Sequence, residues 1–566
     1  MVKSKLSNRK KYFFSISTMS LLICLAISLL NIPFFIKISL YSSVFIVFLM
    51  SLYISQVEKH IDCYNIVCKK DRLYFLILVL ICTIFAMVLI NFKFKGYYVN
   101  LIYQISIGLC VFGVIASLLM FWVDREAIAK IYTILGISFG FSFMTIFPVG
   151  VVPDEAMHIY TAYSLSNQIM NVDVNNEEDE LVMRDCDSVY PFHYSQKYYN
   201  KENLNQYYLD SDMPASNMSS HIYTKPLIDN CLFLYIIPAL GITIGRLLTL
   251  NSIQVFCVGR IFNLLAFVFI TAFCIYKIKK GKNLLFVIAL LPCTLQQSMG
   301  VTYDNPINCL FFLIFTYMIN IFYFKNSIHS KYEYIMLIGI CGVLALVKSN
   351  AYIFISILPL LLLVWRKAYS RFGNKIYYVG TFLICTTIAC VFYYFNNQPK
   401  VILSNESVLS IKFLIQNPKE IFTIMYNTIV ETGSYYLDTF VGRYLGYLSF
   451  AMHPFVLYIY YFLLLLASCK KENERQVIPS NEKVLFIFIS LIETLAIITG
   501  MLLANSTFGD HLVLGMQGRY LMPCVLLILL GFENKYVSVS DNIESLLIYL
   551  INITSIFMVC NFMLVV

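Results

Sequence analysis

Two adjacent carboxylates and an imidazole follow an apolar stretch in the run Pro-Asp-Glu-Ala-Met-His at residues 153–158. Asp154 and His158 stand four residues apart, which places both on one face if the segment is a helix. A carboxylate and an imidazole held together can accept a proton or bind a cation, and Glu155 adds a second acid. The pattern is also typical of a helix N-terminus with Asp154 as its cap. The two interpretations are compatible, because a capping carboxylate can also face a ligand.

A second acid and several basic residues accompany this run in a chain that has little charge elsewhere. Asp304 lies in a polar segment at residues 301–306, between two apolar stretches, and it too can cap the helix that follows. The basic candidates are Lys225, Arg260, Lys348, Arg443 and Arg519, the last of them two residues after Gln517. A single cation at membrane depth can simply extend to the interface. Five cations on one face together predict an anionic ligand there.

The elements that position these residues are membrane helices. The 566 residues are 59% hydrophobic and only 13% charged, whereas about 25% of a soluble domain is charged. Apolar stretches near the roughly 18 residues that cross a bilayer recur along the whole chain. We therefore predict an all-α polytopic protein in a lipid bilayer, with about fifteen spans. They lie near residues 12–30, 38–55, 73–90, 101–123, 131–147, 255–275, 284–299, 306–324, 334–346, 351–365, 376–395, 455–466, 484–503, 521–532 and 546–566.

The orientation follows from the Lys and Arg residues of the short loops, because basic loops stay in the cytoplasm. With a cytoplasmic N-terminus, the predicted spans put most of the 41 Lys and Arg residues inside. Two large segments, residues 149–254 and 396–454, then lie outside. The apolar stretch 231–250 is predicted to lie in the outer interface, because counting it as a span would move the four lysines of residues 277–282 outside. Asp154 and Asp304 then share the outer face of a plasma membrane.

Some function classes are disfavoured by the same patterns. The net charge of +9 comes from dispersed basic residues rather than one basic stripe, so nucleic acid is not an expected partner. The chain has no Gly-rich phosphate loop of the common nucleotide-binding types on the cytoplasmic side. The 17 cysteines form no paired CxxC groups, which disfavours metal binding by cysteine.

Five runs carry a resemblance to a known family: PDEAMHIYTAYSLS, KPLIDNCLFLYIIPALGITIGRLL, GRIFNLL, SMGVTYDN and MQGRYLMP. Together they resemble the bacterial membrane-protein family called domain of unknown function 2142, which is itself similar to the GT-C class of membrane glycosyltransferases. The resemblance starts near residue 128 and runs to the C-terminus. It implies a GT-C-like bundle at residues 128–566, with interfacial helices in its outer loops. Residues 1–127 are then a separate N-terminal extension of four helices.

The GT-C resemblance implies roles for the candidate residues. Asp154 is the expected base that deprotonates an acceptor hydroxyl, assisted by Glu155 or His158, and Asp304 is the expected second acid. The expected contacts to the donor phosphate are Lys225 and Arg519, with Arg260, Lys348, Arg443 and Gln517 as further candidates. Some GT-C members use a divalent metal ion, so a metal held by Asp154 and Asp304 is an alternative.

The function that these expectations define is a membrane glycosyltransferase. Its donor would be a polyprenyl-phosphate-linked sugar, and its acceptor a cell-envelope polysaccharide or a lipid-linked glycan on the extracytoplasmic face. Direct displacement at the anomeric carbon would invert its configuration. Two other functions stay open at this point: a transporter or flippase of lipid-linked oligosaccharide, and an O-antigen-type polysaccharide polymerase.

Overall fold

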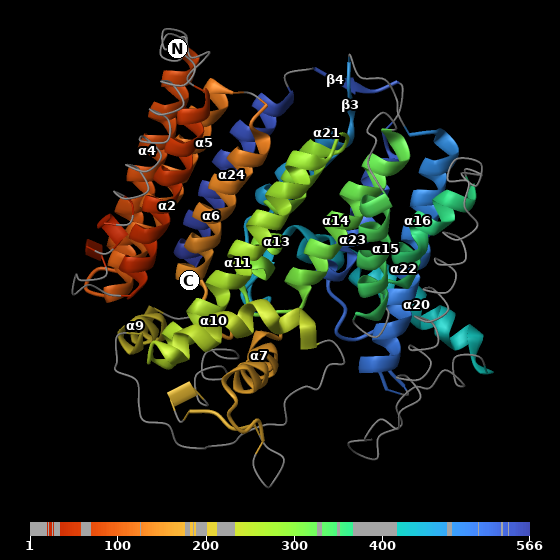
Figure 1. Cartoon of the computed structure of the whole chain (residues 1–566), viewed down its shortest axis with the longest axis horizontal. Coiled ribbons are helices and arrows are strands. Elements are labelled where there is room, and N and C mark those ends of the chain that lie inside the picture. The colour runs from red at the N-terminus through yellow and green to blue at the C-terminus, as the bar shows by residue number, and fades with distance from the viewer. Residues whose placement is uncertain are drawn as a thin grey trace.

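A computed structural model describes most of the chain. The described residues are 34–57, 70–124, 126–175, 181–184, 186–187, 201–211, 232–324, 331–347, 351–365, 416–472, 478–507, 509–533, 536–540 and 543–565, with a few positions between 20 and 27. These residues are nearly all helical (Figure 1). The described strands have two residues each: β1 (Tyr444–Leu445) pairs with β2 (Phe450–Ala451) in antiparallel orientation, and β3 (Lys470–Lys471) pairs with β4 (Ser538–Val539) in parallel.

Seven described helices are long and apolar enough to cross a membrane, because each contains an extended apolar run with few charges. They are α4 (Lys70–Lys93), α5 (Tyr98–Val123), α6 (Ile128–Ile146), α11 (Ser252–Lys277), α14 (Asp304–Tyr323), α22 (Ser480–Asn505) and α24 (Ile543–Val565). Further helices coincide with predicted spans: α2 (Phe34–Val57), α15 (Lys331–Leu346), α16 (Ile353–Trp365), α21 (Pro454–Ser468) and α23 (Met522–Gly531). The prediction of a polytopic helical membrane protein is confirmed. The count of fifteen spans stays a prediction, because those near residues 12–30 and 376–395 lie largely outside the described residues.

The predicted span at residues 284–299 is a broken helix. The structure divides it into α12 (Lys282–Ala289) and α13 (Pro292–Met299). Pro292 has no N–H to donate and disfavours a helical conformation of the residue before it, and Leu291 accordingly has an extended backbone with ψ 142°. All residues of α13 are buried.

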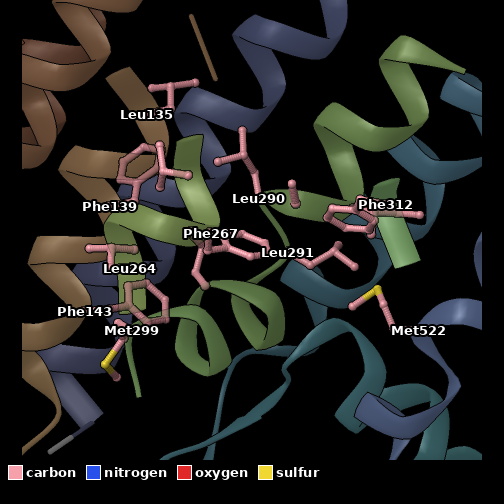
Figure 2. Packing of buried hydrophobic residues seen from close by; sticks show 14 of the residues in the cluster. Leu135, Phe139, Phe143, Leu264, Phe267, Leu290, Leu291, Met299, Phe312 and Met522 are labelled. Atoms are coloured by element: carbon pink, nitrogen blue, oxygen red, sulfur yellow. The ribbon is translucent and has the colours of Figure 1, made fainter. Parts of the chain in front are cut away.

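The hydrophobic core surrounds this break. Figure 2 shows Leu290 and Leu291 among aromatic side chains from neighbouring helices, with Phe267 of α11 and Phe312 of α14 close by. Leu135, Phe139 and Phe143 of α6, Leu264 of α11, Met299 of α13 and Met522 of α23 belong to the same cluster. This packing joins α11, which carries Arg260, α14, which begins at Asp304, and α23, which follows Arg519.

Short helices gather at one end of the bundle (Figure 1). They are α7 (Glu155–Met170), α9 (Lys201–Asp210), η1 (Leu232–Tyr235) and α10 (Ile236–Leu247). Helix α10 exposes an apolar face that includes Ile237, Leu240 and Ile244. Its other face meets α11 so closely that a Cβ atom on Gly241 would lie 2.7 Å from the carbonyl oxygen of Val258. An amphipathic helix of this length fits the interfacial position predicted for residues 231–250.

Helix α20 (Pro418–Val441) lies within the segment 396–454, where the sequence predicted an outer loop. Its threonines accept hydrogen bonds from the backbone before α23: Val513 N donates to Thr428 Oγ1 over 2.9 Å, and Gly518 N donates to Thr439 Oγ1 over 2.8 Å. Helix α20 therefore holds the loop that leads to η3 (Gly518–Leu521).

The described part of residues 1–127 packs on the rest of the bundle. Helix α5 lies along α6 and also contacts α24. Trp122 Nε1 donates to the Tyr549 hydroxyl over 2.8 Å, and Lys93 Nζ donates to the carbonyl of Leu564 over 2.5 Å. The division between 1–127 and 128–566 stays a prediction, and these contacts cross it.

Candidate functional site

Asp154 occupies the N-cap position of α7 in an unusual conformation. Its φ of 64° and ψ of 0° lie in the left-handed region, which is uncommon for residues other than glycine. The carboxylate makes no capping hydrogen bond to α7. Its side chain is 47% exposed, and Oδ2 accepts a hydrogen bond from Arg519 Nη2. The backbone thus starts a helix, as the capping interpretation predicts, while the carboxylate is directed to another element.

Arg519 joins the two candidate acids. Its Nη2 contacts Asp154, and its Nε lies 3.3 Å from Oδ2 of Asp304, the first residue of α14. Nη1 also donates to the carbonyl of Pro153 over 3.2 Å, and Nη2 to the Tyr520 hydroxyl over 3.0 Å. The arginine is buried, whereas Asp154 stays accessible. Asp154, Asp304 and Arg519, which the sequence predicted on one face, are therefore in contact.

The glycine before Arg519 explains how the arginine is positioned. A Cβ atom on Gly518 would lie 2.0 Å from the carbonyl oxygen of Tyr436 and 2.4 Å from the amide nitrogen of Phe440, both in the backbone of α20. Only glycine permits this approach. Gln517, half-buried, lines a small cavity of about 10 Å³ beside Arg519, together with Gln297 of α13.

Two helices begin at the acids of this site. Asp154 precedes the first turn of α7, and Asp304 lies in the first turn of α14. The N–H groups of a first helical turn lack partners in their own helix and carry a partial positive charge, which favours anions. The guanidinium of Arg519 adds a full positive charge. The site thus combines anion-attracting helix ends with two carboxylates.

Glu155 forms a different kind of site, closed to ligands. Both it and Arg260 are fully buried. Arg260 Nε donates to Glu155 Oε1 over 2.7 Å and Nη2 to Oε2 over 2.5 Å, while the amides of Gly150 and Val301 donate to the same carboxylate over 2.9 Å each. Arg260 also donates to the carbonyl oxygens of Phe147 and Pro148. This geometry favours a positioning role for both residues over the predicted assistance to the base and contact with the donor phosphate.

His158, within the first turns of α7, is buried among aromatic residues. Its Nδ1 is 2.7 Å from the Tyr235 hydroxyl, and its ring meets the edge of Tyr303 at 4.4 Å. Tyr303 precedes Asp304, and burial together with the charge of Asp304 raises the pKa of its hydroxyl well above the usual range. Sequence reasoning missed both tyrosines. Tyr303 stands in the predicted segment beside Asp304, so proximity in sequence was the available signal.

Of the remaining predicted phosphate contacts the structure describes Arg443, whose ion pair is not with Asp154 or Asp304. Arg443, two residues after the end of α20, pairs with Asp438 at 2.7 Å and lies over the ring of Tyr444. Lys225 and Lys348 lie outside the described residues.

A metal ion bridging Asp154 and Asp304 would compete with the guanidinium of Arg519 for the two carboxylates. Arg519 lies against both Asp154 and Asp304, where a shared metal ion would also have to bind. Among the described residues there is no group of three or more His, Cys, Asp or Glu side chains with the arrangement of a metal site. The residues present fit an arginine-bridged acid pair better than a metal centre.

One family, described as "Predicted membrane protein (DUF2142)", matches residues 137–528. The chain belongs to this family. The matched region begins in α6 and ends in α23, so it contains Asp154, Asp304 and Arg519. No curated protein and no solved structure matches the chain. The family resemblance expected from the five sequence runs is confirmed, and the family description names no reaction.

Proposed function

We propose that this DUF2142 protein is a membrane glycosyltransferase that moves a sugar from a polyprenyl-phosphate donor to an envelope glycan. The observation that carries the proposal is the state of Asp154. This carboxylate is accessible, lies in a left-handed backbone conformation that costs energy, and contacts Arg519 instead of capping its own helix. Such an arrangement presents a base beside a fixed cation.

The reaction needs one base. The donor's leaving group is a phosphate that carries its negative charge well, so no strong acid is required. Asp154 takes the proton of the acceptor hydroxyl while the hydroxyl oxygen bonds to the anomeric carbon. The bond between that carbon and the phosphate oxygen breaks, and its electron pair leaves with the phosphate. A single displacement inverts the anomeric centre.

Arg519 is the proposed contact for the departing phosphate. Its guanidinium is held by Asp154, Asp304 and the Pro153 carbonyl, so its position is set before the donor binds. Two carboxylates surround this one arginine in the described site, so an anionic donor needs more positive charge. The N-termini of α7 and α14 supply part of it. Lys225 and Lys348 are the sequence candidates for the rest.

Replacing the base tests the proposal. In a deletion strain, the chain carrying Asp154→Asn should express normally and fail to restore the missing glycan, measured by mass and linkage analysis of the envelope polymers. Asp173→Asn is the matched control, since Asp173 is an exposed acid just beyond the end of α7. Restoration of the glycan by the Asp154→Asn chain would overturn the assignment of the base.

A transporter of lipid-linked oligosaccharide is the second candidate, because the broken helix α12–α13 is a feature of many transporters. Purified protein separates the two. With a polyprenyl-phosphate sugar and an acceptor, a transferase releases polyprenyl phosphate, whereas a transporter leaves the bond between sugar and lipid intact. NMR of the product linkage would show inversion or retention.

A further inference from the structure

A second cavity lies at the opposite end of the bundle from Asp154, near β3 and β4 (Figure 1). Its volume of about 440 Å³ is far larger than the space beside Arg519 and falls in the range of small-ligand sites. The ends of α5, α21 and α23 and the starts of α6, α12 and α24 line it. It is distinct from the proposed active site and does not depend on the proposed function.

Four lysines and three glutamates line this cavity. Glu533 and Glu544 are paired with lysines, and Glu126 is the third glutamate. Lys280 Nζ lies 3.0 Å from Glu533 Oε1, and Lys471 Nζ pairs with Glu544 Oε1. Glu533 is further balanced by Lys483, whose Nζ is 3.7 Å away. These pairs join the turn before α12, strand β3, helix α22, the residues after α23 and helix α24. With four lysines and three glutamates, the cavity wall carries no net negative charge.

The other two lysines are available to a ligand. Lys279 and Lys282 line the cavity, and neither forms an ion pair within the part of the chain that the structure describes. Lys279 lies over the ring of Phe324 at 5.7 Å, and its amide donates to Asn320 Oδ1 over 3.0 Å. Gly281 between them has a φ of 85°, which permits the sharp turn from α11 into α12. The turn places both lysines in the lining of the cavity.

We propose that this cavity binds a phosphate group, with Lys279 and Lys282 as its ligands. Lysine is a common partner of phosphate oxygens, and the paired glutamates keep the two remaining cations from being cancelled. Phe121, Leu284 and Leu530 add apolar surface to the wall, which suits a glycerol or acyl portion next to the phosphate. Basic pockets between membrane helices on the cytoplasmic side bind lipid head groups, and loop charges predict that this end is cytoplasmic. The phosphate is carried either by an anionic phospholipid or by a soluble phosphate ester.

Calorimetric titration of the purified full-length protein tests the site with dihexanoyl phosphatidylglycerol, glycerol 3-phosphate and dihexanoyl phosphatidylcholine. The double variant Lys279→Gln/Lys282→Gln should bind the anionic probe at least about tenfold more weakly, since two charge-assisted hydrogen bonds are lost. Lys279→Arg/Lys282→Arg should retain binding, which guards against a loss caused by misfolding. Lys277→Gln is the matched control, because Lys277 lies in the same basic segment outside the cavity.

The outcomes separate the sources of the phosphate and can overturn the site. Binding of phosphatidylglycerol without glycerol 3-phosphate identifies a lipid head group, and equal binding of both identifies a soluble ester. Unchanged affinity in the glutamine double variant would overturn the proposal. An equal loss of affinity in Lys277→Gln would also overturn it, because general surface charge would then explain the binding. Equally tight binding of phosphatidylcholine would overturn it as well, because this lipid has no net charge.

Discussion

Two arginine–carboxylate pairs lie at neighbouring positions of the same run and differ in their access to solvent. Glu155 and Arg260 are fully buried, and every oxygen of the carboxylate accepts hydrogen bonds. Asp154 pairs with Arg519 but keeps 47% of its side chain exposed. A closed pair can hold helices together, whereas an open pair can exchange its partner for a ligand. Glu155 and Asp154 carry the same functional group, and their exposure to solvent sets them apart. The buried Glu155 supports the fold, whereas the accessible Asp154 is the proposed base.

The largest expected effect comes from breaking the closed pair. Arg260→Met leaves the Glu155 carboxylate buried without its cation, and we expect a loss of about 3–5 kcal/mol in folding stability. Thermal unfolding followed by fluorescence-detected size exclusion measures this. Adding Glu155→Gln should recover part of the loss, because no buried charge then remains. A stable Arg260→Met protein with weakened donor binding would instead support the predicted phosphate contact.

The open pair should respond in activity rather than in stability. Arg519→Lys keeps the charge and loses the planar fork that contacts Asp154, Asp304 and the Pro153 carbonyl together. We expect transfer to fall by about 10²–10³-fold, the usual cost of one preorganised donor. Arg443→Lys is the control, since Arg443 pairs with Asp438 outside the site. Equal losses in both variants would contradict a special role for Arg519.

A smaller effect is expected from the glycine that positions Arg519. Gly518→Ala introduces a methyl group against the backbone of α20, which cannot move aside as a flexible side chain can, so we expect a cost of about 3 kcal/mol, the upper end for overpacking. The rate of sugar transfer should fall by more than the loss of stability alone would cause. The reason is that the added methyl group displaces η3 and with it Arg519. Gly433→Ala in α20 meets no atom within 4 Å and should be harmless. Thermal unfolding and transfer rates of the two variants decide the point.

The smallest effect on stability is expected from Tyr235, which contacts His158. Tyr235→Phe removes the hydroxyl that lies 2.7 Å from His158 Nδ1, and a buried hydrogen bond of this kind contributes about 0.5–1.5 kcal/mol. Tyr103→Phe offers a matched control, because the buried Tyr103 hydroxyl forms no hydrogen bond with any residue that the structure describes. If the two variants have equal unfolding temperatures, the contact between Tyr235 and His158 is not stabilising.

Much of the candidate site could be predicted because charge is rare in an apolar chain. Asp154, Asp304 and Arg519 were expected on one face from loop charges alone, and they do meet. The sequence could not show that Glu155 pairs with Arg260, since the two lie 105 positions apart. The residue type also does not tell a buried, paired arginine from one that binds a ligand. Interfacial helices were expected in the outer loops, but the bounds of α20 within the segment 396–454 could not be predicted, because that helix is less apolar than a membrane span.

By itself the sequence determined the helical membrane class, the family and the set of rare charges, because each depends on local composition and short runs. Only the tertiary structure decided which acid is accessible. Accessibility depends on contacts between segments that are distant in sequence. Arg260 of α11 pairs with Glu155 in the protein interior. Arg519 is positioned by the close approach of Gly518 to α20, and it contacts Asp154 while that side chain stays exposed. Adjacent residues on a helix point in different directions, so neighbours in sequence reach different surroundings.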